Sequence, residues 1–337
     1  MNYYLIIPLL ILVLYLGKFL ILPLLFSFLI FIILKSLSKK LSSINTFNFS
    51  LNYYLSFVIV CLSLLFFFYF VGTLVQNNLS RVIENSNIYQ DNIQEILSII
   101  QKTEINLSFL SIEDLLKNIN FGKILSSILN FFTNAAGNIS LILIYLIFFI
   151  LEEKVFKIKL NKIFPNKSTK KILKNINNQI YGYFEIKTLT SLLTGFLTFI
   201  ILTTLSNDLA ILFGIFAFLL NFIPFIGSLV SILIPFVFSL IQTLEFSISI
   251  ITLISLTFSQ LLIGNFVEPK LMGKSLNLSP IIMLIFLGIF GKIWGISGMF
   301  LSVPILVVLL IVFSNFNQTK AIAVFLSEKG NIKYLYN

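Results

Sequence analysis

Three apolar blocks of about 30 residues or more constrain the fold of this chain more than any other feature: 5–34, 210–240 and 280–313. As a single helix, each block would be roughly 45–50 Å long, because an α-helix rises 1.5 Å per residue. The hydrocarbon core of a membrane is only about 30 Å thick. In lipid, moreover, backbone polar groups must be bonded within the protein. Each block is therefore expected to break or reverse inside a helical membrane structure.

The composition agrees with a membrane location. Hydrophobic residues make up 58% of the 337 positions and charged residues 11%, whereas soluble domains are about 25% charged. We predict an all-α polytopic membrane protein in a lipid bilayer, with about eight membrane segments, some of them in broken or re-entrant hairpins. The first 34 residues lack a basic n-region and exceed the apolar core of a signal peptide, which is about 7–15 residues long. The first span is therefore expected to be retained.

Lysines indicate which segments face the cytoplasm, because cytoplasmic loops are enriched in basic residues. Residues 152–187 contain nine lysines, and further lysines follow the first block and occur in the tail. Both termini are thus expected to be cytoplasmic, in a multi-pass membrane protein. For 152–187 the pattern favours this orienting role over a contact with phospholipid headgroups. Glu185 and Lys187 are only two residues apart and should not pair on a helix.

These assignments divide the chain into six parts. They are N-terminal membrane helices (1–75), an extracytoplasmic amphipathic helical segment (76–134), a membrane helix (135–151), a Lys-rich cytoplasmic segment (152–187), a C-terminal membrane core (188–313) and a cytoplasmic tail (314–337). Within the first part, Gly17 and Pro23 are expected to separate helices 5–16 and 19–34, which should form a tight pair.

The segment 76–134 has four basic and six acidic side chains, which suits the outer side of the membrane, and apolar residues at helical spacing such as Ile93, Ile96 and Leu97. A second stripe follows Ser111-Ile-Glu-Asp114, which has the form of a helix-capping box. An apolar stripe usually marks burial. The pattern therefore favours an amphipathic hairpin on the bundle or membrane surface over an oligomer contact or an extracytoplasmic gate. A homo-oligomer is left open.

Several kinds of chemistry are excluded by what the chain lacks. It has no histidine and one cysteine, Cys61, which removes imidazole metal sites, Ser–His catalysis and an intrachain disulfide. No metal-ligand cluster or nucleophile with a base is recognisable. We therefore expect a protein that is not an enzyme and uses no catalytic residue, metal or cofactor. Topology accounts for the net charge of +10, so nucleic acid is not an expected partner.

The second and third apolar blocks are interrupted by glycine and proline. Residues 221–227 should form a tight tip, because proline removes a backbone donor and glycine permits a sharp reversal. A hairpin with its tip inside the protein and two short full spans joined by a turn both remain open. In the third block the glycines between 288 and 298 mark a second reversal. Lysines before and after this block require an even number of crossings, so it is expected to be a hairpin.

Three motifs stand out along the C-terminal half: Leu220-Asn-Phe-Ile-Pro-Phe-Ile-Gly227, Asn265-Phe-Val-Glu-Pro-Lys-Leu-Met-Gly-Lys-Ser-Leu-Asn-Leu-Ser-Pro280 and Trp294-Gly-Ile-Ser-Gly-Met-Phe-Leu-Ser-Val-Pro304. Their order and spacing resemble the fingerprints of the autoinducer-2 exporter family of bacterial membrane transporters, over roughly residues 135–313. The resemblance implies an alternating-access carrier that exports a small polar solute, autoinducer-2, a sugar-like quorum-sensing signal. Some family members are similar to sodium(lithium)/proton antiporters, which is the alternative function.

The two functions need different sites. An ion carrier needs a carboxylate at membrane depth, whereas the candidate carboxylates lie at loop edges: Glu185, Asp208, Glu245 and Glu268. A neutral polyol needs amide and hydroxyl partners. The candidate transport and gating residues are Asn221, Gln260, Asn265, Glu268, Lys270, Lys274, Asn277 and Lys292. The candidate hairpin and hinge residues are Pro224, Gly227, Pro269, Gly273, Pro280, Gly291, Gly295, Gly298 and Pro304.

Glu268 is the best single candidate for a mechanistic charge. Pro269 should bias Glu268 away from helical geometry and place its carboxylate where the preceding span ends. Lys270 and Lys274 are the nearest cations in sequence, and Lys292 lies in the second hairpin. A role in helix-end capping, or as a solvated surface charge, stays open for Glu268.

Overall fold

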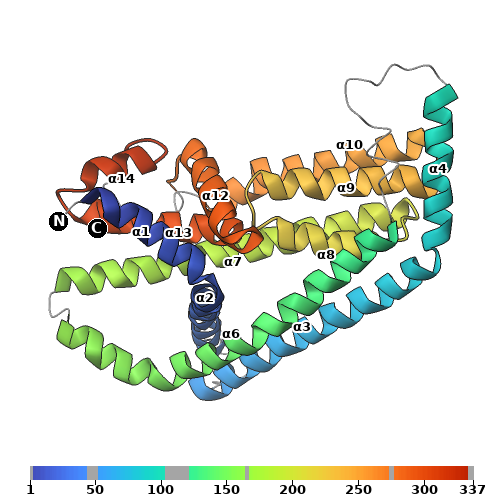
Figure 1. The fold of residues 1–337 in the computed structure, drawn as a ribbon. Helices are drawn as coiled ribbons and strands as arrows, with labels where there is room; N and C mark the ends of the chain where they lie inside the picture. The colour runs from blue at the N-terminus through green and yellow to red at the C-terminus, as the bar shows by residue number, and fades with distance from the viewer. Residues whose placement is uncertain (1–2, 44–51, 103–120, 164–166, 273–276, 333–337) are drawn as a thin grey trace. The chain divides into compact units, whose positions relative to one another are not determined.

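The computed structural model describes residues 3–43, 52–102, 121–163, 167–272 and 277–332. Regular structure in these residues is helical throughout (Figure 1), which confirms the prediction of an all-α chain. Six of the described helices are long and apolar enough to cross a membrane. Two shorter apolar helices, Ala210–Leu220 and Pro280–Trp294, accompany these spans, in keeping with a polytopic membrane protein.

The helices are named as in Figure 1. Their bounds are α1 Tyr3–Leu16, α2 Lys18–Ser43, α3 Tyr53–Glu84, α4 Ser86–Lys102, α6 Phe121–Ile163, α7 Lys167–Thr204, α8 Ala210–Leu220, α9 Ile226–Thr243, α10 Phe246–Leu262, a π-helical turn Ile263–Val267, α11 Glu268–Met272, α12 Pro280–Trp294, α13 Ile296–Asn315 and α14 Lys320–Leu326.

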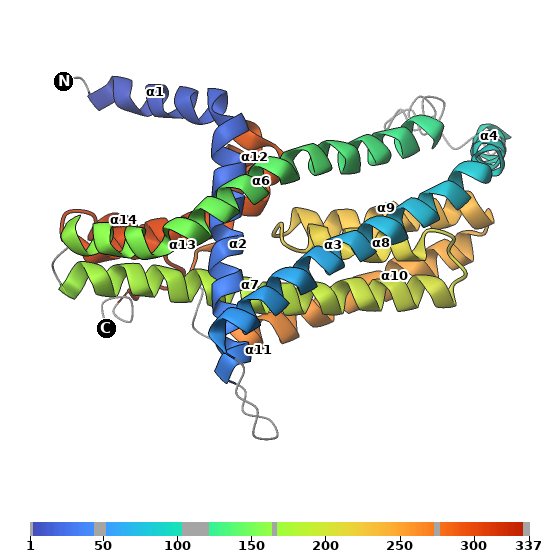
Figure 2. The same ribbon diagram turned by 90° about the horizontal axis from the view of Figure 1, so that it is seen from below.

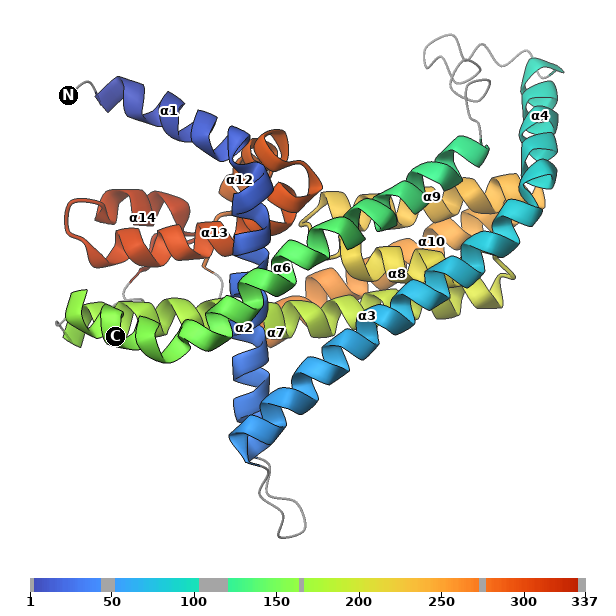
Figure 3. The same ribbon diagram turned by 60° about the horizontal axis from the view of Figure 1, so that its bottom comes forward.

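The chain divides into two compact units. Unit 1 comprises Met1–Leu64, Gly137–Thr188 and Pro269–Asn337, and unit 2 comprises Leu65–Ala136 and Leu189–Glu268. Helices α3, α6 and α7 each continue from one unit into the other. Within unit 2, α8, α9 and α10 lie side by side (Figure 3).

The first apolar block breaks at Gly17 as predicted, but Pro23 lies inside α2 and the expected tight pair does not form. Helix α1 leaves α2 at a wide angle (Figure 2). A single residue separates the two helices, and the Gly17 N–H still donates to the Val13 carbonyl at 2.8 Å. The backbone therefore bends without reversing. Helix α1 contacts α12 instead, where the Trp294 Nε1 donates to the Leu14 carbonyl at 2.9 Å.

The second block breaks between α8 and α9, which confirms the predicted tight tip. A Cβ added at Gly227 would lie 1.8 Å from the carbonyl oxygen of Leu220, so only glycine fits there. Phe225 adopts a left-handed φ of 61° at the reversal. Helix α8 has 11 residues and rises about 16 Å, roughly half the hydrocarbon core. This length favours the hairpin with an internal tip over two full spans.

The third block forms the expected hairpin of α12 and α13. The chain reverses at Gly295, whose φ of 64° and ψ of −145° are open to glycine but strained for other residues. A Cβ at Gly298 would lie 2.0 Å from the Phe290 carbonyl oxygen, and one at Gly291 would lie 2.8 Å from the Met299 Cε. Pro280 is the first residue of α12, a favourable position for proline, and Pro304 lies within α13.

The prediction that Pro269 would push Glu268 out of helical geometry is wrong. Glu268 has φ −62° and ψ −50°, and its N–H bonds to the Ile263 carbonyl, five residues earlier. The π-helical turn Ile263–Val267 therefore precedes the proline directly. Such a widened turn can accommodate the ring and the missing backbone donor. The helix then continues as α11, so Glu268 lies on a helical segment.

Helix α4 packs against the other helices of unit 2, as its apolar stripe predicts, whereas the predicted hairpin with the second stripe stays a prediction. Tyr89 and Ile93 are buried in a core with residues of α7, α8, α9 and α10, and Ile96 and Leu97 pack against it. The Tyr89 hydroxyl donates to Asp208 at 2.6 Å, and the Asn92 amide donates to the Ile241 carbonyl at 2.9 Å. The expected capping box at 111–114 lies outside the described residues.

Candidate transport site

The interior of unit 2 is polar along α7. Thr190, Ser191, Thr194 and Thr198 are at most 1% exposed. Thr194 follows Thr190 by four residues and Ser191 by three, and Thr198 follows Thr194 by four, so all of them lie on one face of the helix. Large apolar side chains that are 38–60% exposed lie on other faces: Leu189, Leu192, Leu193, Phe196 and Ile200. Helix α7 thus presents hydroxyl groups to the protein interior and hydrocarbon to its surroundings. Small hydroxyl residues between helices are typical of packing in lipid.

Helices α9 and α10 repeat this arrangement with a further set of buried polar side chains: Ser231, Ser239, Ser249, Thr252, Ser259 and Gln260. The Ser231 hydroxyl donates to the Gly227 carbonyl at 2.7 Å, and the Thr252 hydroxyl to the Ile248 carbonyl at 2.9 Å. Each hydroxyl proton thus bonds to a carbonyl of its own helix. The lone pairs of the hydroxyl oxygens remain able to accept hydrogen bonds from a polar solute.

The α8–α9 tip joins this polar interior through Asn221. Its Nδ2 donates to the Ser191 hydroxyl on α7 at 3.0 Å, and both side chains are buried. Helices α7 and α8 approach each other closely at Gly195 and Gly214, where an added Cβ would lie 2.6–3.0 Å from the opposite glycine's carbonyl oxygen. Small residues allow such backbone contact between membrane helices. The break in the second block thus places an amide beside the hydroxyl face of α7.

The predicted transport residues of unit 2 do not all lie in this interior. Asn221 and Gln260 are buried, whereas Asn265 is exposed on the π-helical turn. The Glu268 side chain is partly exposed, and the residue interacts with another group of the protein. Its proposed pairing with Lys292 stays a prediction.

In unit 1, Lys270 and Lys292 are exposed, and Gly273 and Lys274 lie outside the described residues. Asn277 is engaged with the C-terminal tail. Its Nδ2 donates to the Asn331 carbonyl at 2.8 Å, and its Oδ1 accepts from the Lys329 N–H at 3.4 Å. A role for Asn277 in solute binding is therefore less favoured than a structural one.

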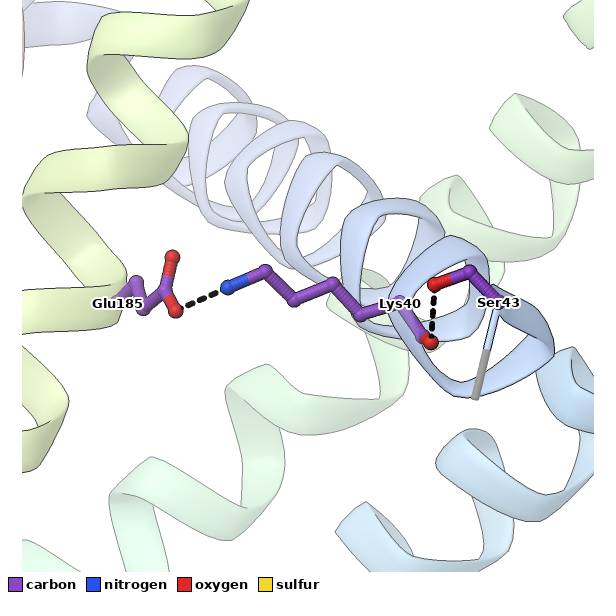
Figure 4. A network of polar contacts seen from close by, with 3 residues as sticks. All are labelled: Lys40, Ser43 and Glu185. Carbon is purple, nitrogen blue, oxygen red and sulfur yellow. Dashed lines mark hydrogen bonds and ion pairs between the residues drawn. The ribbon is translucent and has the colours of Figure 1, made fainter. Parts of the chain in front are cut away.

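A second set of polar contacts lies in unit 1, where α2 meets α6 and α7. The Lys40 ammonium pairs with Glu185 of α7 (Figure 4) and lies 5.3 Å from the centre of the Tyr181 ring. Glu185 thus has a partner on another helix, in keeping with its unsuitable spacing from Lys187. On the same helix α2, Lys35 pairs with Glu153 of α6 at 2.7 Å, and Lys157 pairs with Glu153 at 2.7 Å.

The charges around Glu153 change its acidity. Burial alone would raise the pKa of Glu153, but the hydrogen bonds from Lys157 and Lys35 lower it overall. The bond to Glu153 correspondingly raises the pKa of Lys157. Glu153 and Lys157 therefore stay charged at neutral pH. The network can hold the ends of α2 and α6 together, although exposed ion pairs contribute only about 0–1 kcal/mol each.

Two residues of unit 1, Lys187 and Lys40, were not among the functional residues that the sequence predicted. Lys187 is 5% exposed and is the one buried charged side chain among those that the structure describes. It lies one turn before Ser191 on α7. The signal was present in the sequence, because Lys187, Thr190, Ser191 and Thr194 follow helical spacing within an apolar segment. The partner of Glu185 had no such signal, because Lys40 is 145 residues away.

A polar interior, enclosed by several helices that carry apolar side chains on their outer faces, is the construction of a polytopic membrane transporter. The comparison with known families agrees. The chain belongs to the AI-2E transporter family, since the family model described as "AI-2E family transporter" matches residues 4–318. This result confirms the resemblance drawn from the three motifs.

Individual relatives are similar over different lengths. A protein of Borreliella burgdorferi, provisionally described as a transport protein, is 41% identical over 56% of this chain, and the match spans 53% of the relative. A provisionally described transport protein of Haemophilus influenzae is 28% identical over 83% of this chain and 82% of its own. The AI-2 transport protein TqsA of Escherichia coli is 28% identical over 75% of this chain and 74% of its own.

Proposed function

We propose that this chain exports a small polar solute of the autoinducer-2 type across the bacterial inner membrane by alternating access. The observation that carries the proposal is the buried hydroxyl and amide set of unit 2, formed by faces of α7, α9 and α10 with Asn221 at the α8–α9 tip. Such groups suit the hydroxyls of a small sugar-like molecule, which both donate and accept hydrogen bonds. The name of the E. coli relative supports the same class of solute.

The exposure of the carboxylates supports a neutral solute over sodium/proton exchange. Among the side chains that the structure describes, every Asp and Glu is partly or fully exposed, including Glu185, Asp208 and Glu245. A sodium or proton carrier needs a carboxylate at membrane depth. The experiment below therefore distinguishes sodium/proton antiport from export of a neutral solute.

The two hairpins support alternating access. Each has a short apolar helix, a break, and a glycine that abuts a carbonyl of the preceding helix: Gly227 against Leu220, and Gly298 against Phe290. Each glycine is followed four residues later by a serine, Ser231 or Ser302. Discontinuous helices in corresponding positions of two repeats commonly form the binding sites of secondary transporters.

The test uses the purified protein in liposomes, with flux of radiolabelled autoinducer-2 and of a panel of small sugars measured beside sodium and pH jumps. Asn221→Ala removes the amide that reaches Ser191, and Ser191→Ala removes its partner. Each is expected to lower sugar flux at least about tenfold, a change of roughly 1.4 kcal/mol in the barrier.

Leu192→Ala is the matched control, because Leu192 is 46% exposed and does not lie on the polar face of the same helix. Its flux should stay within about twofold of the parent protein. Sodium-driven proton movement without sugar flux would reject the solute exporter in favour of the antiporter. Equal losses in all three variants would show that the polar face is not the solute path.

A further inference from the structure

Most of the net positive charge of this chain is concentrated in one helical hairpin. Residues 154–184 contain eight lysines and no acidic residue, whereas the whole chain has a net charge of +10. The remaining residues together thus carry a net charge of only +2. The structure places this segment at the end of α6 and the beginning of α7. The lysine pattern alone favours an orienting role, whereas the exposed apolar side chains that accompany the lysines of α6 in the structure favour a contact with lipid as well.

The lysines of α6 accompany a strip of exposed apolar side chains. Leu151, Val155 and Ile158 follow one another at helical spacing and are 70%, 47% and 57% exposed. The strip continues the exposed apolar face of the preceding span, where Ile147 and Phe148 are 54% and 58% exposed. A lipid-facing surface therefore extends beyond the span into the basic segment.

Lysines border this strip and end it. By helical geometry, Lys154 lies on one side of the apolar strip and Lys159 on the other. Lys162, four residues after Ile158, occupies the next position along the strip. All three side chains are exposed. Lysine stems that cover apolar surface while their ammonium groups reach polar surroundings are typical of the membrane interface.

Helix α7 adds a second basic face. Lys170, Lys171 and Lys174 are exposed, whereas Ile180 on the other side of the helix is buried. Helix α7 has 38 residues and would be about 57 Å long, which exceeds the hydrocarbon core by roughly 27 Å. Its first turns therefore lie outside the core, at the depth of the headgroups or beyond.

Among the residues that the structure describes, no carboxylate pairs with Lys154, Lys159 or Lys162. The nearby Glu153 is already shared by Lys35 and Lys157. Within the described part of the chain, Lys154, Lys159 and Lys162 form no ion pair. Their charges are left for a ligand from outside.

We propose that the end of α6, with Lys154, Lys159 and Lys162 around the strip Leu151–Val155–Ile158, binds anionic phospholipid of the surrounding leaflet, and that the basic face of α7 extends this surface. The lipid phosphates pair with the ammonium groups and the acyl chains cover the apolar strip. Basic segments beside a membrane are attracted by the negative charge of anionic lipid. Inorganic phosphate and nucleic acid offer the anion but leave the strip exposed, so the geometry favours lipid.

The experiment measures lipid selectivity and needs no transport activity, so its result is independent of the proposed function. The full chain is reconstituted with spin-labelled phosphatidylglycerol or phosphatidylcholine, and the protein-bound fraction of each is read from the immobilised component of the spectrum. The parent protein should prefer phosphatidylglycerol. Lys159→Gln/Lys162→Gln should reduce this preference at least about threefold, and Lys159→Arg/Lys162→Arg should restore it.

Lys39→Gln/Lys329→Gln is the matched control, because it removes the same charge from exposed lysines outside the hairpin. An equal loss of preference in this control, or no loss in Lys159→Gln/Lys162→Gln, would overturn the proposal. Inorganic phosphate added at constant ionic strength should not abolish the preference, and abolition would assign the site to phosphate alone. Binding of a DNA fragment without lipid selectivity would assign it to nucleic acid.

Discussion

Gly227 shows how strictly a single position can be determined. Its missing side chain lets the backbone of α9 return to within contact of the Leu220 carbonyl, which places Asn221 at the hydroxyl face of α7. Gly298 has the same relation to Phe290 in the other hairpin. Neither carbonyl can move easily, because both belong to the helix backbone. The glycine is thus required by close backbone approach.

Gly227→Ala should lower the free energy of unfolding by about 1–3 kcal/mol, the usual cost of overpacking a tight site, and should reduce transport more than membrane insertion. Gly72→Ala is the control, since a Cβ there meets nothing within 4 Å. Thermal unfolding in detergent, followed with a thiol-reactive dye on Cys61, gives the comparison. Equal stability of the two variants would contradict the contact at the tip.

Glu268, the first residue of α11, directly follows the π-helical turn, and we propose it as the charge that takes part in gating. Glu268→Gln should lower liposome transport about tenfold, equivalent to roughly 1.4 kcal/mol. Glu245→Gln, an exposed loop carboxylate, should have little effect. Near-normal transport by Glu268→Gln across the pH range would assign the residue a structural role.

At the scale of elements, α4 is held by specific contacts at one end of unit 2. Tyr89 is 2% exposed, stacks edge to face with Phe238 and donates to Asp208. The turn that carries Asp208 is in turn held by Gln242, whose Nε2 donates to the Ser206 carbonyl at 2.8 Å. An apolar stripe alone would allow the helix to slide, whereas these hydrogen bonds define its position.

Tyr89→Phe should destabilise the docking of α4 by about 1 kcal/mol, the usual value of one hydrogen bond. Amide hydrogen exchange over Ser86–Lys102 should accelerate about fivefold, while Tyr69→Phe, which alters a 71% exposed ring, should leave it unchanged.

The docking of α4 should also depend on pH. Burial, and then the hydrogen bond to Asp208, raise the pKa of Tyr89. The stabilisation is therefore full below the ordinary tyrosine pKa of about 10 and is lost as the pH rises through the raised value.

At the scale of the whole molecule, the distribution of lysines gives a testable orientation. In a Cys61→Ser background, Lys162→Cys should be protected from a membrane-impermeant thiol reagent added outside, and Glu95→Cys should react. Both side chains are exposed on their helices, so the reagent reports the side of the membrane and not local burial. Reaction at Lys162→Cys together with protection at Glu95→Cys would invert the orientation.

The sequence determined that the chain is helical, three of the points where helices break (Gly17, 221–225 and Gly295) and the family of the chain. The backbone groups of a membrane helix form their hydrogen bonds within the helix, to residues four positions away. The length of an apolar segment and its glycines and prolines are therefore sufficient to predict where such a helix lies and breaks. The break at 221–225, the reversal at Gly295 and the glycine contacts all follow from such local features.

Only the tertiary structure decided which distant groups meet. Lys40 pairs with Glu185 across 145 positions, α1 turns towards α12, and the Asn277 amide bonds to the tail. It also decided that a π-helical turn keeps Glu268 helical before Pro269. The physical reason is that a partner is selected by packing between helices. Many different pairs of charged or polar side chains in one sequence would bind each other with similar energy. The packing of the helices brings only one of these pairs within hydrogen-bonding distance.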